Sequence, residues 1–156
     1  MSQENIKKPL SKLVEFCNKN ELEYIVTGTV ALSMLGVPSN FTPNGIDIKI
    51  FKPDEKREAK LKELQFLSGL ENCNYKNSKC YSFLIDGVKV NAIIENDKCF
   101  KDCISTEVIH VLIDTVDNSY IVPVQKVFFA LRAKMKLNRP KDNAYMLSLI
   151  SNCASL

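Results

Sequence analysis

The stretch YIVTGTVALSMLGVPSNFTPNGIDIKIF, residues 24–51, sets the order of elements around which the rest of the chain is arranged. Its first residues are aromatic and β-branched and end at Gly28, a pattern that predicts a short buried strand. The segment TVALSMLG then predicts a short helix, with Thr29 as its N-cap and Gly36 as its stop. A strand therefore leads through a glycine turn into a helix.

The second half of this stretch is a loop that leads into another strand. Residues 37–45 contain two prolines, two asparagines and a glycine, which is typical of a loop. Residues 46–51 alternate, so the three isoleucines share one face, and Asp47 and Lys49 share the other. Such a strand start could carry an Asp-x-Asp metal motif, but Gly45 fills the first place of that pair.

The remaining sequence predicts an α+β fold in one domain that spans residues 1–156. The segment YSFLIDGVKVNAII is typical of a β-hairpin, because Asp86 and Gly87 tolerate the positive φ angles of a type I′ turn. We expect a small mixed sheet with helices packed mainly on one side. The other predicted elements are helices at residues 8–19, 53–66, 123–137 and 141–153, and strands in EVIHVLIDT and SYIVPV.

The last two predicted helices combine apolar stripes with basic residues. The expected apolar faces are Val124, Val127, Phe128, Leu131 and Met135 in the first helix, and Met146, Leu149, Ile150 and Cys153 in the second. Basic residues crowd the segment 126–141 with no acid between them. This segment is either a solvated helix face or a patch that binds phosphate groups or nucleic acid.

Composition and charge narrow the class of protein. The chain has 156 residues, of which 46% are apolar and 25% charged, as in ordinary globular proteins. Its net charge of +3 is too small to indicate nucleic-acid binding by itself. The N-terminal segment MSQENIKKPL lacks the apolar core of a signal peptide, and no apolar run is long enough to span a bilayer. We therefore expect a cytoplasmic protein, not bound to a membrane, whose six cysteines are reduced thiols.

Four segments together resemble the minimal nucleotidyltransferases, especially the small toxin-type members linked to abortive infection and toxin–antitoxin pairs. VTGTVALSMLGV resembles the strand, glycine turn and helix of that family, and SNFTPNGIDIKI resembles its acid-bearing strand. DGVKVNAII has the form of its later hairpin strand, and RPKDNAYMLSLI fits its Arg-x-Lys-Asp helix start. The resemblance covers residues 24–150 and implies a nucleotidyltransferase-like fold.

The chemistry of that family is matched less completely than its backbone pattern. Asp47 matches the second catalytic acid, whereas Gly45 and Asn91 occupy the places of the first and third. Tyr145 stands where the family often repeats an aspartate. Nucleotidyl transfer relies on magnesium ions that carboxylates and substrate phosphates hold, so neutral residues at two of three positions weaken the metal site.

The resemblance also implies a set of ligand contacts. The implied nucleotide-binding residues are Gly28, Thr29, Asp47, Lys134, Arg139 and Lys141. Magnesium is the one cofactor that the resemblance implies, and Asp47 is its expected ligand. Asp142 fits either the Lys-Asp pair of the family or an ordinary acid at the start of the last helix.

These observations support three hypotheses about function. The first is a nucleotidyltransferase-fold protein that does not catalyse transfer, and that binds a nucleotide weakly or has a partner-binding or regulatory role. The second is an active magnesium-dependent nucleotidyltransferase that moves a nucleotide from a nucleoside triphosphate to RNA, protein or a small acceptor. The third is a purely structural module that forms an oligomer or binds a protein partner.

Overall fold

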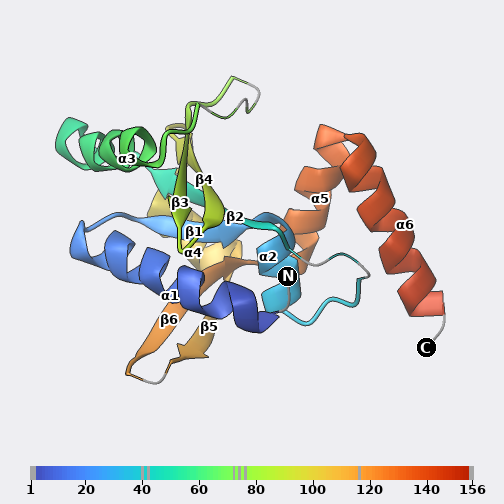
Figure 1. Cartoon of the computed structure of the whole chain (residues 1–156). Coiled ribbons are helices and arrows are strands. Elements are labelled where there is room, and N and C mark those ends of the chain that lie inside the picture. The colour runs from blue at the N-terminus through green and yellow to red at the C-terminus, as the bar shows by residue number, and fades with distance from the viewer. Residues whose placement is uncertain are drawn as a thin grey trace.

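The computed structural model describes residues 3–39, 41, 43–71, 73, 75, 77–115 and 117–154. In chain order the elements are α1 (Gln3–Lys19), β1 (Tyr24–Thr27), α2 (Gly28–Met34), β2 (Gly45–Phe51), α3 (Glu55–Ser68), β3 (Cys80–Ile85), β4 (Val88–Glu95), α4 (Phe100–Thr106), β5 (Val108–Asp114), β6 (Ser119–Gln125), α5 (Val127–Leu137) and α6 (Pro140–Ala154). Figure 1 shows α1 crossing the near side of the sheet, with α5 and α6 standing beside it beyond α2.

The six strands within the described residues form one mixed sheet in the order β3-β4-β2-β1-β6-β5. The central strands β1 and β2 are antiparallel, while β2 pairs with β4 and β1 pairs with β6 in parallel. The edge strands β3 and β5 pair antiparallel with β4 and β6. The predicted α+β class with a small mixed sheet is confirmed.

The alternation of β2 divides the two faces of the sheet as predicted. Ile46, Ile48 and Ile50 are fully buried and belong to the main hydrophobic core, to which α1 contributes Leu10 and Leu13. Burying a branched aliphatic side chain contributes roughly 1.5–3 kcal/mol relative to exposing it, so this face fixes the register of β2. Its polar residues consequently project from the opposite face.

The first helix begins earlier than its sequence pattern predicts. We expected it at residues 8–19, but α1 begins at Gln3 and contains Pro9 in its interior. Proline in a helix removes a backbone donor and disfavours the preceding helical turn. Ile6 is nevertheless buried in the main core, and this tertiary contact supports the additional turn.

The predicted hairpin is confirmed, and its edge strand is capped by a helix. Asp86 and Gly87 have φ angles of 50° and 77°, so both lie in the left-handed region that a type I′ turn requires. At the outer edge of β3, the Ser82 amide donates to the Gln65 side chain at 2.8 Å and the Leu84 amide donates to Ser68 Oγ at 2.9 Å. These bonds attach α3 to an edge whose amides would otherwise be open for pairing.

The buried face of α5 differs from the predicted stripe. The helix begins only at Val127, because the preceding residues complete β6. Phe128 and Met135, expected in the core, are each 66% exposed, whereas Ala130 and Lys134 are buried. The helix is therefore rotated relative to the expected orientation, because it packs on α2 and α6.

The last helix shows the same kind of difference. Ile150, expected in the core, is 61% exposed, and the Cys153 side chain lies outside the described residues. The buried positions of α6 are instead Asp142, Tyr145 and Ser148, which recur at three-residue intervals. The face of α6 that packs against the rest of the molecule is therefore the one that carries these three residues, not the predicted apolar face.

Sequence periodicity did not predict the short helix α4. It packs on the other side of the sheet from α1, where Phe100 and Cys103 join a separate apolar cluster with Ile25, Phe51 and Val108. Among the described residues, no helix has both the length and the apolar character needed to cross a membrane.

Candidate functional site

A row of polar side chains crosses four strands at one level of the sheet. The register places Thr27 of β1 opposite Asp47 of β2, Asp47 beside Asn91 of β4, and Asn91 opposite Ser82 of β3. Residues paired in this way project from the same face, which here is the face opposite the isoleucines. The structure therefore brings together the two residues that occupy catalytic-acid places in the sequence pattern, Asp47 and Asn91.

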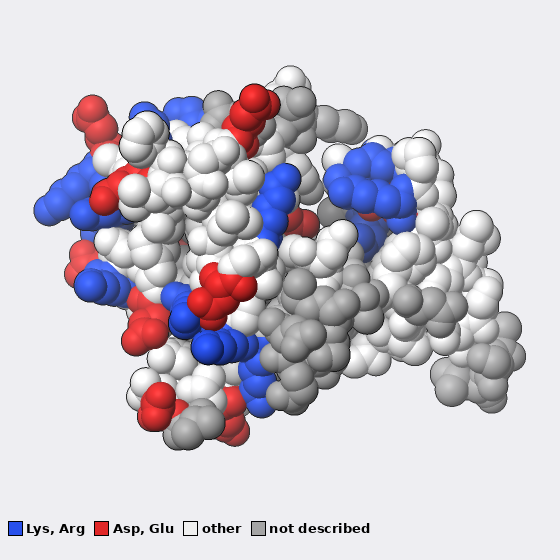
Figure 2. Space-filling view, viewed as in Figure 1, with Lys and Arg blue, Asp and Glu red and all other residues white. Residues whose placement is uncertain are grey.

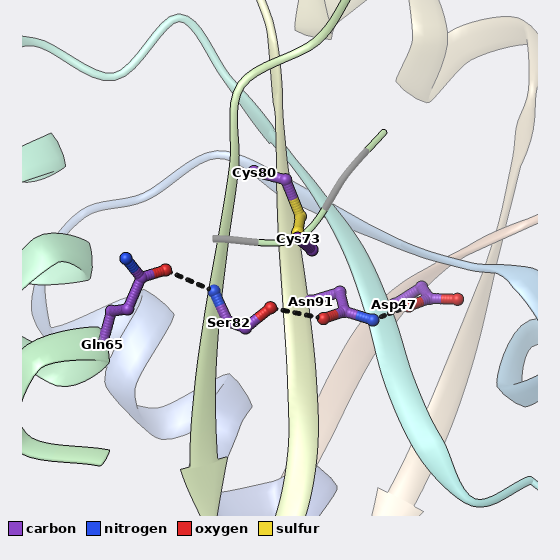
Figure 3. The surroundings of a disulfide bond; sticks show 6 residues. All are labelled: Asp47, Gln65, Cys73, Cys80, Ser82 and Asn91. Atoms are coloured by element: carbon purple, nitrogen blue, oxygen red, sulfur yellow. Dashed lines mark hydrogen bonds between the residues drawn. A yellow bond between two sulfur atoms is a disulfide. The ribbon is translucent and has the colours of Figure 1, made fainter. Parts of the chain in front are cut away.

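Asn91 donates a hydrogen bond to the carboxylate of Asp47. The distance from Asn91 Nδ2 to Asp47 Oδ1 is 3.2 Å, and Ser82 Oγ donates to Asn91 Oδ1 at 2.7 Å (Figure 3). The Asn91 amide takes this orientation because a carboxylate only accepts hydrogen bonds, so its partner must be the amide nitrogen and not the amide oxygen. Asn91 therefore presents a donor, not an oxygen ligand, to Asp47.

Gly28 leaves the space that Asp47 occupies. Its φ angle is +70°, and a Cβ placed on it would lie 3.0 Å from Asp47 Oδ2. A side chain at this position would therefore meet both left-handed backbone strain and the carboxylate. Gly28 therefore lies directly against the Asp47 carboxylate, and its nucleotide-binding role stays a prediction.

The N-cap of the second helix is Thr27 rather than Thr29. Because α2 begins at Gly28, Thr29 lies within its first turn, and no side-chain capping bond is made by Thr27. The Thr29 hydroxyl instead accepts a hydrogen bond from Lys134 Nζ at 2.9 Å. Gly36 ends the helix with a φ angle of +76°, as expected for a glycine stop.

The position of the missing first acid is closed to a side chain. A Cβ on Gly45 would lie 2.9 Å from the carbonyl oxygen of Lys89, a backbone atom of the neighbouring strand. That separation is shorter than contacts that real Cβ atoms make, so an aspartate at this place would require β2 and β4 to shift. The glycine is thus built into the pairing of these strands.

The polar row of the sheet is one wall of the site, and α5 with the start of α6 forms a second wall opposite it. Asp142 is 1% exposed, and its Oδ2 accepts from Arg139 Nε at 2.6 Å while its Oδ1 accepts from Arg139 Nη2 at 3.0 Å. Lys134 Nζ lies 3.8 Å from Asp142 Oδ1. The buried carboxylate therefore fixes the positions of both cations and is not itself a wall residue of the cleft.

The pKa shifts agree with this arrangement. Burial acts to raise the pKa of Asp142, but the hydrogen bonds from Arg139 outweigh it and hold the pKa below its usual range. Burial lowers the pKa of Lys134, and the nearby Asp142 opposes that effect. The hydrogen bond to Asp142 raises the pKa of Arg139. The ion pair thus keeps its charge near neutral pH.

Two aromatic residues complete this wall. The ring centroids of Phe41 and Tyr145 are 6.0 Å apart, and Lys134 Nζ lies 4.6 Å from the centre of the Tyr145 ring. Tyr145 is 3% exposed, whereas Phe41 is 43% exposed. Tyr145, which replaces an acid of the resembled pattern, therefore packs against a cation instead of adding a negative charge.

The two walls enclose a cleft of about 460 Å³. Its lining residues are Thr29, Phe41, Pro43, Asn44, Gly45, Asp47, Lys89, Asn91, Lys134, Arg139, Lys141 and Tyr145. Figure 2 shows basic side chains gathered where α5 meets α6, beside the hollow between these helices and the sheet. The predicted site residues thus meet in one cleft, apart from Gly28, which lies behind Asp47.

Sequence reasoning did not name four residues of the lining, namely Phe41, Pro43, Asn44 and Lys89. Lys89 lies two positions before Asn91 on β4, and the alternation of a strand places both on one face, so this residue could have been found. The other three lie in the loop before β2, and they gave no such signal because this loop carries no periodic pattern.

The side chains of the cleft do not fit a metal centre built by the protein. Among the described residues, no group of three or more His, Cys, Asp or Glu side chains is placed to hold a metal ion. Asp47 is the only carboxylate among the described lining residues, and one of its oxygens already accepts from Asn91. Magnesium in proteins requires oxygen ligands in near-octahedral geometry, and this donor set supplies one carboxylate.

A disulfide bond lies on the same face of the sheet as the polar row, which corrects the prediction that all cysteines are reduced thiols. Cys73 and Cys80 are bonded, with Cα atoms 5.5 Å apart (Figure 3). Cys80 lies two residues before Ser82 on β3, and the alternation of the strand places both side chains on one face. The loop before β3 turns back onto its own strand and brings the two Cα atoms within disulfide range, which cysteine spacing alone does not reveal.

Cys17, Cys99 and Cys103 are free cysteines. Cys17 and Cys103 are buried, and burial raises the pKa of Cys17 to about 12 and that of Cys103 to about 11. These thiols therefore stay protonated and unreactive at neutral pH. Cys99 is exposed.

Comparisons with known proteins agree with the architecture. No protein-family model and no curated protein matches the chain. The crystal structure of a proposed nucleotidyltransferase from Thermotoga maritima matches with a TM-score of 0.64 at 17% identity, covering 97% of this chain and 96% of that one. An antigenic nucleotidyltransferase-like protein from Paracoccidioides brasiliensis matches with a TM-score of 0.52 at 14% identity, covering 97% of this chain and 76% of that one. The mixed six-stranded sheet thus has a nucleotidyltransferase-like fold.

Proposed function

We propose that the protein binds the phosphate groups of a nucleotide in the cleft between the polar row of the sheet and the α5–α6 wall, and that it does not transfer the nucleotide. The observation that carries this proposal is the pairing of a cationic wall with a single carboxylate. Lys134, Arg139 and Lys141 line one side of the cleft, and Asp47 faces them from the sheet.

The cationic wall is suited to phosphate. Arg139 and Lys134 are held in place by the buried Asp142, so little side-chain entropy remains to be lost when an anion binds. Lys141 is exposed and free to follow the ligand. Charge-assisted hydrogen bonds of this kind are roughly twice as strong as neutral ones.

Transfer requires more negative charge than the sheet provides. An in-line attack on the α-phosphate uses metal ions that neutralise the charge developing there, and a carboxylate set must hold those ions. Asn91 is neutral and donates to Asp47, and the backbone of Lys89 closes the space at Gly45. The Asp47 carboxylate alone cannot organise a two-metal centre.

Calorimetry with ATP and each of the other nucleoside triphosphates tests the binding half of the proposal. Lys141→Gln removes one charge from the cleft, and we expect it to weaken binding about tenfold, as the loss of one charge-assisted hydrogen bond does. Lys136→Gln is the matched control, because Lys136 is also exposed, lies on α5 and does not line the cleft. No heat with any nucleoside triphosphate contradicts nucleotide binding.

Incubation with α-phosphate-labelled nucleoside triphosphates and cell fractions tests the other half. We expect no incorporation of label into RNA, protein or small acceptors. Incorporation that Asp47→Ala abolishes would instead establish an active nucleotidyltransferase and would refute the loss of catalysis.

A further inference from the structure

The Asn91 amide occupies the side of Asp47 where a metal ligand would be needed. Its Nδ2 atom lies 3.2 Å from Asp47 Oδ1, and a hydrogen-bond donor satisfies that oxygen in the way a cation would. An asparagine can offer its oxygen to a metal only by rotating the amide. Rotation here would place Asn91 Oδ1 against the Asp47 carboxylate, which has no proton to share.

The surrounding residues hold the amide in this orientation. Ser82 is fully buried, and its hydroxyl donates to Asn91 Oδ1 at 2.7 Å. The backbone amide of Ser82 in turn donates to Gln65 of α3, so this part of the edge strand is tied to the helix (Figure 3). A chain of hydrogen bonds thus runs from α3 through β3 and β4 to Asp47, and it orients the donor toward the carboxylate.

The charge that a metal would supply is provided by side chains. Four cations line the cleft, namely Lys89, Lys134, Arg139 and Lys141. Against them stand two carboxylates, Asp47 in the cleft and Asp142 beneath it, so the site keeps a formal surplus of two positive charges. This surplus favours the most highly charged form of a phosphate ligand, and a bound magnesium ion would cancel two of its negative charges.

From this arrangement we infer that the cleft binds a triphosphate without a metal ion, with its lysine and arginine side chains and the Asn91 amide in the place of magnesium. The inference rests on the proposed nucleotide-binding function and states which form of the ligand the site takes. The ligand class is a metal-free nucleoside triphosphate or another polyphosphate of similar charge.

The test is calorimetric titration with ATP, and separately with inorganic triphosphate, in buffer that contains either EDTA or excess magnesium at the same ionic strength. We expect the wild-type protein to bind ATP in EDTA at least as tightly as in magnesium, and inorganic triphosphate to bind in EDTA as well. We expect Lys141→Gln to weaken both titrations about tenfold in EDTA, and Lys136→Gln to leave them unchanged.

Asn91→Asp reverses the expected metal dependence. The new carboxylate removes the amide donor to Asp47 and adds a negative charge that repels the phosphates of ATP. ATP should therefore bind weakly in EDTA and more tightly in magnesium. We expect this variant to be less stable, so its unfolding is followed in parallel, and Lys141→Gln remains as a test at an exposed position.

Three outcomes separate this inference from the function on which it rests. Binding in EDTA that equals or exceeds binding in magnesium supports both. Binding of ATP only in magnesium overturns the inference and leaves the proposed function standing. Absence of binding under both conditions overturns the proposed function and the inference together.

Discussion

The contact between Asn91 and Asp47 can be tested by replacing the Asn91 amide nitrogen with an oxygen. Asn91→Asp replaces the donating nitrogen, 3.2 Å from Asp47 Oδ1, by a carboxylate oxygen. Two like charges at that separation repel by about 1–5 kcal/mol, for effective dielectrics between those of water and of a protein surface. The hydrogen bond between the two side chains is lost as well. We therefore expect the free energy of unfolding, measured by urea titration in EDTA at neutral pH, to fall by an amount in this range.

Magnesium should partly reverse that loss. The variant places two carboxylates together, and a dication bound between them stabilises the folded state by about 2.7 kcal/mol when its concentration is a hundred times its Kd. The wild-type protein, which lacks this pair, should unfold at the same urea concentration with magnesium or EDTA.

Asn18→Asp is the matched control for this experiment. It adds the same charge at an exposed position of α1, away from the cleft, and should change stability little in either buffer. If Asn91→Asp were as stable as the wild type in EDTA, or were unaffected by magnesium, the described contact between the two side chains would be wrong.

Three further outcomes follow from the site and its surroundings. Gly28→Ala should lose more stability in urea than Gly36→Ala, because both meet about 1–2 kcal/mol of left-handed strain but only Gly28 has Asp47 Oδ2 within 3.0 Å of the added Cβ; equal losses would contradict the close approach. Burial acts to raise the pKa of Asp142, but hydrogen bonds from Arg139 hold it below its usual range, so the stability contributed by this carboxylate is present above the unfolded-state pKa and lost as pH falls through the folded-state pKa. The difference in free energy of unfolding between the wild type and Asp142→Asn should accordingly shrink below about pH 4, and a difference constant with pH would refute this assignment. Cys73→Ser should cost about 2–3 kcal/mol, as expected for a short disulfide loop, and dithiothreitol should destabilise the wild type by a similar amount while leaving the variant unchanged; a wild type insensitive to reductant would contradict the cross-link.

Local sequence patterns predicted the elements that carry the polar row. The alternation of β2 identified the isoleucine face and the opposite position of Asp47, and the Asp86–Gly87 pair identified the hairpin that carries Asn91. These predictions succeeded because strand alternation and turn geometry depend on neighbouring residues. Composition identified the basic segment 126–141, and the resemblance to nucleotidyltransferases singled out Lys134, Arg139 and Lys141, which all line the cleft.

The orientation of the last two helices required tertiary structure. Apolar periodicity in α5 pointed to Phe128 and Met135, yet Lys134 is the residue that is buried. Its amine is satisfied by Thr29 and Asp142, which come from helices far apart in the sequence, so no local pattern could predict its burial. The missed disulfide has a similar cause, since it depends on how a loop returns to its strand.

The sequence by itself therefore determined the order along the chain of the strands and of the helices other than α4. Its resemblance to the nucleotidyltransferases implied that carboxylates are absent from two of three expected places. Only the tertiary structure decided what fills those places. The backbone of Lys89 closes the space beside Gly45, and the Asn91 amide donates to Asp47. The physical reason is that alternation and turn preferences act between neighbours in the chain, whereas the hydrogen bonds and charges of the cleft act between strands and helices that only folding brings together.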